Sequence, residues 1–258
     1  MLHSKSYSNI AKKIGSSGSI PELVFIMASQ IIRICFYSYV LLVAISCTKT
    51  CVEDISVDPV RVSVVGASIS TYKGYVGNNN SYYPRGDVLS VDSTWWMQLS
   101  NKKGFVFYQN NSWSGGRITS THKTYPSLIS LVESLDDTDC LLLVGGYNDF
   151  NNNVPIGLSD YSCAYDSLND MQFAQAYDKY LRAAMRKSPQ VYCIILMGIT
   201  TKYAEVMIQT ASYYQLPIID LREIEDTIEM YDFPHPSAHG MQTIANYCYE
   251  RISSNMGI

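Results

Sequence analysis

Short apolar runs recur along the chain from residue 60 onward. Val60-Arg61-Val62-Ser63-Val64-Val65 is rich in β-branched residues and stops at Gly66, which predicts a strand that ends in a tight turn. Cys140-Leu141-Leu142-Leu143-Val144 is apolar without a break, a pattern typical of a parallel strand covered on both faces. Further runs predict strands at 105–108, 191–197 and 217–221.

Segments with helical spacing lie between the predicted strands. A helix is expected from Ser93 or Thr94, as its N-cap, to about Lys102. The segment 71–92 is rich in Tyr, Asn, Gly and Ser, and is predicted to be a long loop overhanging the end of the first strand. Strands alternating with helices predict an α/β fold for residues 60–258: a three-layer α/β/α, flavodoxin-like arrangement around a parallel sheet of about five strands. Apolar residues at helical spacing predict the other helices at 173–184, 204–211 and 241–252.

The N-terminal residues have the pattern of an export segment. Residues 24–46 are mostly apolar, and after Arg33 an uncharged stretch leads to small residues and a cysteine. Ala44-Ile45-Ser46-Cys47 resembles the lipobox of a bacterial lipoprotein signal, with Ala44 where that signal usually has Leu. The resemblance implies that Cys47 is the lipidated first residue of the mature protein.

The export segment is assigned to residues 1–47, and a polar tether without helical periodicity to residues 48–59. A start at Met27 instead of Met1 gives a signal of normal proportions. An uncleaved membrane anchor is the alternative, although the uncharged run is short for a membrane span. In both cases the folded part is expected to be exported, to the periplasm or the cell surface, and tethered to the membrane.

Composition narrows the classes of function. The chain has 258 residues, a net charge of −4 and no run of Lys and Arg, so no nucleic-acid surface is expected. The 21 tyrosines suit carbohydrate or protein surfaces as well as a core. Cysteines outside the export segment form no C-x-x-C pair, so neither a metal site nor a disulfide framework is indicated. Cys140, Cys193 and Cys248 are predicted to be small buried hydrophobes.

Candidate catalytic residues follow the first strand and precede the last helix. Ser68 lies just beyond the first strand, at the edge where open α/β sheets bind ligands. Asp232 and His235 share a loop, and Pro236, predicted as the first helical residue, holds His235 extended. Asp232 can bind one imidazole nitrogen while the other faces Ser68. A serine hydroxyl needs such a base, so the three residues together predict nucleophilic catalysis.

Four sequence blocks, in order, resemble those of the SGNH hydrolases, also called the GDSL esterase/lipase family. The resemblance covers Arg61 to Ile252. It implies that Ser68 is the nucleophile, His235 the general base and then acid, and Asp232 the residue that orients His235. The blocks are Gly66-Ala67-Ser68, Gly115, Gly146-Tyr147-Asn148-Asp149, and Asp232 with His235.

The same resemblance implies an oxyanion hole. Its donors would be the backbone N–H of Ser68, the backbone N–H of Gly115 and the side-chain amide of Asn148. Gly116 is an alternative to Gly115, since the register within Ser114-Gly115-Gly116 is open. Ala67 stands where the family usually has an Asp that braces the nucleophile turn, a departure that bears on the rate more than on the reaction class.

Other assignments near these blocks follow from residue type. Trp113 and Tyr147 are expected to border the substrate. Asp149 is a candidate brace for its loop, and Asn148 has the alternative role of capping the loop after its strand. No metal or organic cofactor is expected. The spacing of Asp232, His235 and His239 also suits a metal ion, but no further ligand cluster accompanies them.

The expected function is that of a serine esterase that hydrolyses carboxylic esters through an acyl-enzyme intermediate. Its substrates are expected to be small-molecule or glycan esters, with acetyl groups released from carbohydrates, and the protein is expected to be a monomer held to the membrane by its lipid. A lipase or thioesterase is an alternative. Two alternatives from other classes are a catalytically weak or inactive carbohydrate-binding surface lipoprotein and a tethered structural lipoprotein.

Overall fold

The structure is a computed structural model that describes residues 27, 28, 32, 58–77 and 80–258. The chain divides into two compact units, Met1–Ser56 and Val57–Ile258. The described residues of the first unit are helical. The predicted lipidation of Cys47 lies outside the described residues, as do the rest of the export segment and most of the tether. Within the described ranges, no helix combines the length and apolar character needed to cross a membrane.

The second unit is built around one parallel sheet of five strands in the order β2-β1-β3-β4-β5. This is the flavodoxin-like order, so the predicted α/β architecture is confirmed. The interior strands are almost wholly buried, whereas β2, at the edge, alternates buried and exposed residues. The strands are β1 (Val60–Gly66), β2 (Phe105–Asn110), β3 (Cys140–Val144), β4 (Gln190–Ile195) and β5 (Ile218–Asp220).

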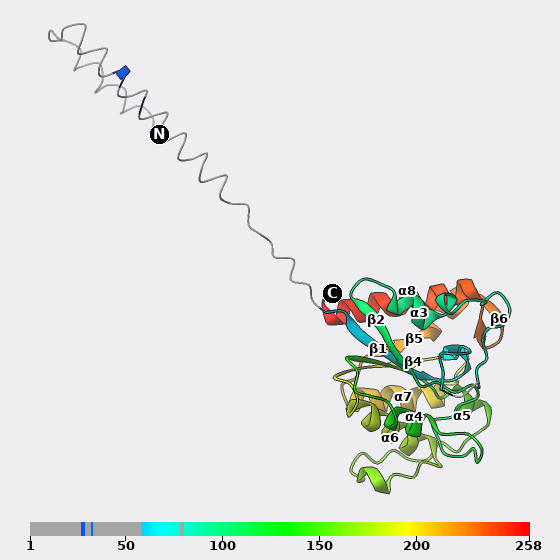
Figure 1. The fold of residues 1–258 in the computed structure, drawn as a ribbon. Coiled ribbons are helices and arrows are strands. Elements are labelled where there is room, and N and C mark those ends of the chain that lie inside the picture. Colours follow the sequence, from blue (N-terminus) through cyan, green and yellow to red (C-terminus); the bar gives the residue numbers. More distant parts are fainter. Residues whose placement is uncertain (1–26, 29–31, 33–57, 78–79) are drawn as a thin grey trace. The chain divides into compact units, whose positions relative to one another are not determined.

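Helices cover both faces of the sheet (Figure 1). α3 (Trp95–Ser100) and α8 (Ala238–Met256) pack together on one face. On the other face α6 packs against both α4 and α7. These three helices are α4 (Leu128–Glu133), α6 (Phe173–Met185) and α7 (Thr201–Tyr213). The core between the layers is rich in aromatic residues and holds the buried thiols. It includes Trp95, Trp96, Tyr177, Tyr180, Cys140, Cys193 and Cys248.

One predicted helix start is confirmed and one was wrong. The first helix begins at Trp95 with Thr94 in the N-cap position, as predicted, although the Thr94 hydroxyl donates to the Val91 carbonyl and makes no capping bond. Val91–Ser93 is a separate 3-10 turn, η2. The last helix begins at Ala238, with Ser237 as its cap. Pro236 is therefore not helical but belongs to a strand.

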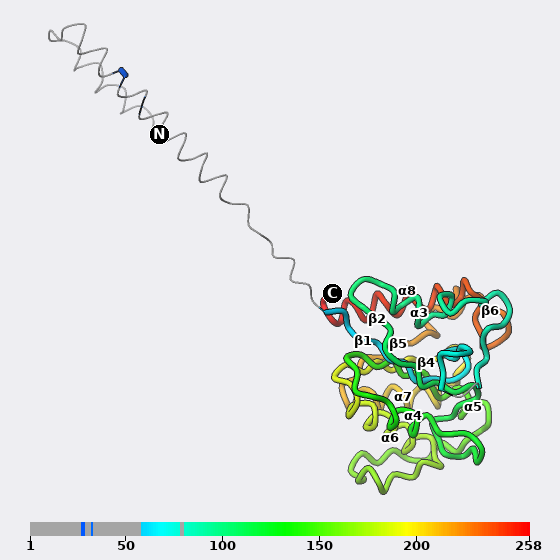
Figure 2. Tube along the Cα trace, viewed as in Figure 1, coloured from blue at the N-terminus to red at the C-terminus, as the bar shows by residue number. Residues whose placement is uncertain are grey.

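Several short elements had no clear signal in the sequence. An antiparallel hairpin lies just before α8, and a one-turn helix follows β3. Both lie at the end of the domain to which the carboxyl ends of the strands point (Figure 2). These elements are α5 (Tyr147–Asn151), β6 (Met230–Asp232), β7 (His235–Pro236) and the 3-10 turns η1 (Ser68–Ser70), η3 (Tyr165–Ser167) and η4 (Leu221–Thr227).

Candidate active site

Ser68 opens the 3-10 turn η1 directly beyond β1, at the carboxyl edge of the sheet. Gly66 makes this turn feasible. A Cβ at Gly66 would lie 2.6 Å from the Ser70 hydroxyl oxygen and 3.0 Å from the Val144 carbonyl oxygen. Only a residue without a side chain lets β1 leave the sheet this close to β3. The turn that follows determines the position of the Ser68 hydroxyl.

His235 and Asp232 come from the β6–β7 hairpin, in which they are cross-strand partners. His235 Nε2 lies 2.8 Å from Ser68 Oγ, and His235 Nδ1 lies 2.5 Å from Asp232 Oδ1. The sequence placed Asp232 and His235 on one loop, whereas the structure places them on paired strands. With the proton on Nδ1 donated to Asp232, Nε2 is free to accept the Ser68 hydroxyl proton.

The electrostatics of the pair favour a neutral imidazole beside a charged carboxylate. Burial lowers the pKa of His235 below its usual 6.5, and this effect outweighs the opposing pull of Asp232. Hydrogen bonds lower the pKa of Asp232: the one from the Tyr82 hydroxyl has the larger effect and the one from His235 the smaller. At neutral pH the imidazole is therefore able to act as a base.

The candidate oxyanion donors differ in what their N–H groups already bind. Gly116 donates its N–H to the Trp113 carbonyl at 2.9 Å, so this group is occupied. The N–H groups of Gly115 and Ser68 donate to no other residue in the described part of the chain. Gly115 has φ of +78°, in the left-handed region that favours glycine. The geometry thus favours Gly115 over Gly116 as a donor.

Asn148 lies on α5 and connects the loops that follow β2 and β3. Its side-chain amide donates to the Gly116 carbonyl at 2.9 Å. An amide carries two N–H groups, so this contact leaves the second one for another acceptor. Asn148 does not cap its own helix, because Gly146 occupies the N-cap position of α5 and Asn148 lies within the helix.

Asp149 fixes the same loop from inside the domain. Its buried carboxylate accepts the Ile118 N–H at 2.9 Å, the Thr119 N–H at 3.0 Å and the Thr119 hydroxyl at 2.7 Å. Burial raises the pKa of Asp149, and these three donors oppose the effect. The sequence suggested that Asp149 braces its own loop. In the structure its carboxylate holds the loop that carries Gly115.

Ala67 is buried, and other residues hold the nucleophile turn. The Gly66 N–H donates to the Ser112 hydroxyl at 2.9 Å, and the Asn110 side-chain amide donates to the Ser70 carbonyl at 2.8 Å. Asn110 in turn accepts the Ser112 N–H at 3.0 Å. Sequence reasoning missed this pair, although two polar side chains directly after a predicted strand were an available signal.

Tyr82 is a second residue that sequence reasoning missed. Its ring stacks on the His235 imidazole with centroids 3.6 Å apart and planes 12° apart. Its hydroxyl donates to Asp232 Oδ2 at 2.5 Å. The only signal was general: Tyr82 belongs to the Tyr-rich loop expected to overhang Ser68.

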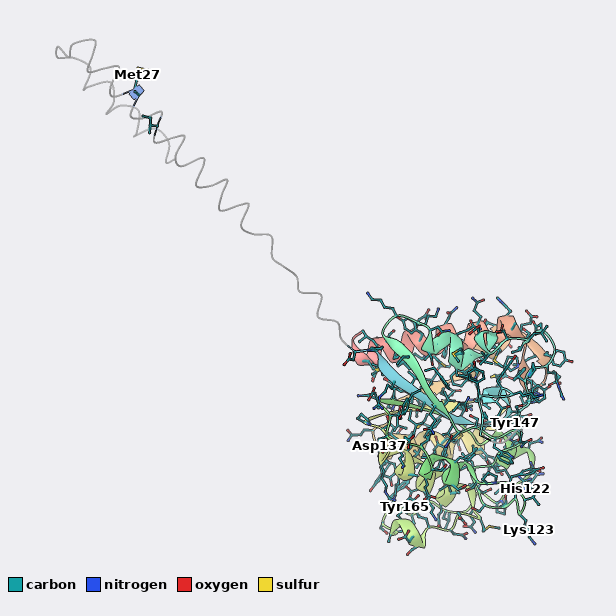
Figure 3. The ribbon with its side chains drawn as sticks, viewed as in Figure 1. Met27, His122, Lys123, Asp137, Tyr147 and Tyr165 are labelled. Carbon is teal, nitrogen blue, oxygen red and sulfur yellow. The ribbon has the colours of Figure 1, made fainter. Side chains whose placement is uncertain are left out.

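Trp113 and Tyr147, which the sequence predicted to border the substrate, each lie beside another aromatic ring. The Tyr147 ring lies 6.1 Å from Phe233, which is 55% exposed, and the Trp113 ring lies 6.0 Å from Tyr125, which is 41% exposed. A Cβ at Gly115 would lie 4.0 Å from the Tyr125 ring. Tyr147 and the loop that holds Tyr125 lie on the same side of the domain in Figure 3, where His122 marks that loop. Trp113 and Tyr147 are therefore each paired with an exposed aromatic ring.

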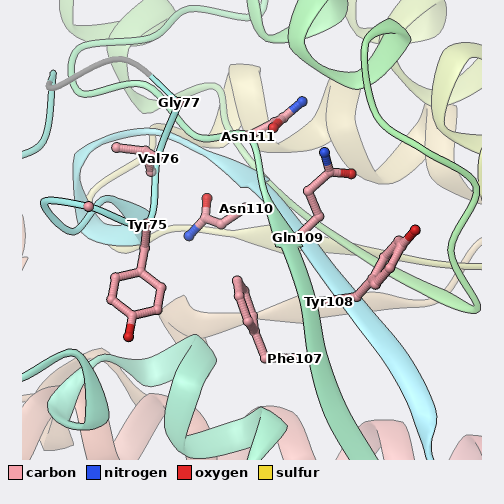
Figure 4. A pocket seen from close by; sticks show the side chains of 9 residues that line it. Tyr75, Val76, Gly77, Phe107, Tyr108, Gln109, Asn110 and Asn111 are labelled. Atoms are coloured by element: carbon pink, nitrogen blue, oxygen red, sulfur yellow. The ribbon is translucent and has the colours of Figure 1, made fainter.

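Two cavities lie elsewhere on the domain, and Ser68 lines neither. One, of about 500 Å³, is lined by Asp87, Asp92 and His239 among others. The second, of about 350 Å³, lies beside β2 and is lined by residues 74–77 and 107–111 (Figure 4). Among the described residues no cluster of three or more His, Cys, Asp or Glu side chains is arranged to hold a metal ion. The metal-site alternative thus gains no support from the geometry.

Comparison with known families gives one whose model matches most of the folded part of the chain. The model of the GDSL-like lipase/acylhydrolase family matches residues 60–252. The chain belongs to this family. No curated protein matches it at a significant level.

Solved structures of similar fold include other members of the family. A protein from Bacteroides uniformis classed as a GDSL-like lipase is 26% identical, with a TM-score of 0.65 and coverage of 76% of this chain and 96% of that one. A similar protein from Bacteroides ovatus is 24% identical, with a TM-score of 0.68 and coverage of 77% and 100%. A family two carbohydrate esterase from Clostridium thermocellum shares the fold at 13% identity, with a TM-score of 0.53 and coverage of 78% and 66%. As a family member, the protein is a serine-type ester hydrolase.

Proposed function

We propose that the protein is a serine esterase that removes small acyl groups, such as acetyl, from carbohydrates through an acyl-enzyme intermediate. The observation that carries the proposal is the continuous contact from Ser68 Oγ through the imidazole of His235 to Asp232. Ser68 is the nucleophile, His235 is the base and then the acid, and Asp232 holds the imidazole tautomer.

In the acylation step Ser68 Oγ attacks the ester carbonyl carbon while its proton passes to His235 Nε2. The carbonyl oxygen becomes an oxyanion that accepts hydrogen bonds from the N–H groups of Ser68 and Gly115 and from the Asn148 amide. The intermediate collapses, the carbon–oxygen bond to the alcohol breaks, and His235 gives its proton to the departing alkoxide. Water then attacks the acyl-enzyme in the same way, which releases the carboxylic acid and restores Ser68.

The exposed rings around the site support a carbohydrate as the alcohol part of the substrate. Phe233 and Tyr125 expose apolar faces, and flat faces of this kind pack against sugar rings. The likeness in fold to the Clostridium thermocellum carbohydrate esterase is in line with this class. From the sequence alone we also propose export and attachment of lipid to Cys47, with the protein acting as a monomer.

The test compares ester hydrolysis by the full-length protein and by Ser68→Ala. The unaltered protein should hydrolyse p-nitrophenyl acetate faster than a long-chain ester and release acetate from acetylated glycans. Ser68→Ala should lower kcat by about 10⁴-fold or more. Ser90→Ala, at an exposed serine whose hydroxyl contacts only Asp92, should retain full activity. Equal turnover by the native protein and Ser68→Ala on every ester would contradict the proposal and favour a binding protein.

A further inference from the structure

One side chain contacts both His235 and Asp232 at the same time. The Tyr82 ring lies parallel to the imidazole, at a centroid distance of 3.6 Å, and its hydroxyl reaches Asp232 Oδ2. Asp232 uses its other oxygen, Oδ1, for His235. Tyr82 therefore limits the rotation of both groups, which otherwise lie on a two-stranded hairpin at the surface.

The exposure of Asp232 makes this contact important. The Asp232 side chain is 50% exposed, against 16% for His235. A half-exposed carboxylate exchanges partners with water, and its pull on the imidazole weakens when it rotates away. With each oxygen bonded to a different side chain, one rotation is favoured.

Tyr82 is itself held in place. The Arg85 guanidinium lies over the ring, 4.4 Å from its centroid. The neighbouring Tyr83 is buried and donates its hydroxyl to the Pro236 carbonyl at 2.9 Å, which ties the Tyr-rich loop to the hairpin. Tyr82 is thus held by contacts besides those with His235 and Asp232.

We propose that Tyr82 is a positioning residue, which holds Asp232 and His235 in the orientation that faces Ser68. The inference rests on the proposed function, in which His235 is the base. Tyr82 takes no proton and does not act on the ester itself. Its contribution is to the alignment of the pair and to the exclusion of water from one face of the imidazole.

The charges that face His235 allow this role to be measured. They are the Asp232 carboxylate, which raises the pKa of His235, and the Arg85 guanidinium, which lowers it; Tyr82, Tyr83 and Ser68 face the ring or its hairpin as neutral groups. The bond from the Tyr82 hydroxyl keeps Asp232 turned toward His235. Removal of that hydroxyl lets Asp232 rotate into water and weakens its pull on the imidazolium, so the pKa of His235 should fall.

The first experiment compares Tyr82→Phe, Tyr82→Leu and the control Tyr72→Phe in the full-length protein. Tyr72 is on the same loop, and its hydroxyl donates to the Leu89 carbonyl, away from the pair. Tyr82→Phe should lower kcat by about tenfold with KM changed less than about twofold, because a hydrogen bond to a charged group is lost. Tyr82→Leu, which also loses the stack, should lower kcat further. Tyr72→Phe should be unchanged, and a Tyr82→Phe enzyme with native kcat would overturn the inference.

The second experiment separates positioning through Asp232 from a purely structural role. In an Asp232→Asn background, Tyr82→Phe should cost less than about twofold, because the charged acceptor is already gone. An equal loss in both backgrounds would refute positioning through Asp232. Titration of His235 by NMR adds a readout that needs no turnover, and Tyr82→Phe should lower the pKa of His235. If the ester assays fail but this fall is seen, the proposed function is wrong. If turnover by Tyr82→Phe is normal and the pKa does not fall, the inference on Tyr82 is wrong.

Discussion

The two sides of the candidate site are held in different ways. The loop that carries Gly115 is fixed from inside, by the buried carboxylate of Asp149 bound to Ile118 and Thr119. The hairpin that carries the base is held at the surface, where Asp232 and Phe233 are each half or more exposed. The side proposed to stabilise charge is therefore anchored in the core, and the side proposed to transfer protons depends more on contacts near the surface.

This difference agrees with the roles proposed for the two sides, which are oxyanion stabilisation and proton transfer. Donors to an oxyanion act best when they are fixed before the charge forms, since they then cost no reorganisation. The base must instead take a proton from Ser68 and then deliver it to a different oxygen, on the departing alcohol. Buried anchors should therefore control both stability and rate, whereas the surface contacts should control rate alone.

The largest effect is expected from the buried anchor. Asp149→Ala leaves three donors without their acceptor and should lower the free energy of unfolding by about 3 kcal/mol. Activity should fall at least as much as in the oxyanion variant below, because the Gly115 loop loses its support. Denaturant unfolding followed by an ester assay measures both. Asp139→Ala is the control, since its ion pair with Arg61 is exposed and should contribute less than about 1 kcal/mol. Equal unfolding curves for the two variants would contradict the claim that the buried carboxylate contributes more to stability than the exposed one.

Asn148→Ala should affect rate far more than stability. Loss of one oxyanion donor lowers kcat by about 10²–10³-fold, while the half-buried side chain gives up one bond to the Gly116 carbonyl. Asn152→Ala removes an amide at the end of the same helix, one that donates to the Asn148 carbonyl at 2.7 Å, and should lose less than about threefold. Similar losses of kcat in the two variants would mean that Asn148 supports the fold of the loop and is not an oxyanion donor.

The smallest effect concerns pH. The active form needs a neutral His235, whose pKa is lowered by burial, so activity should be kept below pH 6.5 and lost as the pH falls through the lowered pKa. Arg85 also lowers this pKa, so Arg85→Gln should move the acid limb of kcat/KM to higher pH. Because Arg85 is exposed, the difference between the two enzymes should shrink at high salt. An acid limb at or above the ordinary histidine pKa would argue that the imidazole is not shielded.

The sequence predicted those parts of the molecule that depend on local pattern. The valine run from residue 60 and the run from Cys140 mark strands because both faces are buried, and their ends locate Ser68 and Asn148. The start of the last helix was predicted too early, because Pro236 lies on a strand of the hairpin and Ser237 caps α8.

Features that depend on tertiary contacts could not be read from the pattern. Tyr82 and Asp232 are 150 positions apart, and nothing in the spacing of a Tyr-rich loop selects the one ring that meets the imidazole. The choice of Gly115 over Gly116 likewise required the position of the Trp113 carbonyl. The hairpin was missed because its strands are too short to show alternation.

The order β2-β1-β3 has a consequence for how such a protein can diversify. The proposed nucleophile, Ser68, follows the middle strand of these three, and two of its candidate oxyanion donors follow the strands on either side. Neighbouring strands are about 4.8 Å apart in any sheet, so backbone hydrogen bonding alone brings the three groups together. A loop such as 152–172 can then change in length and sequence, and recruit new substrates, without moving these three groups.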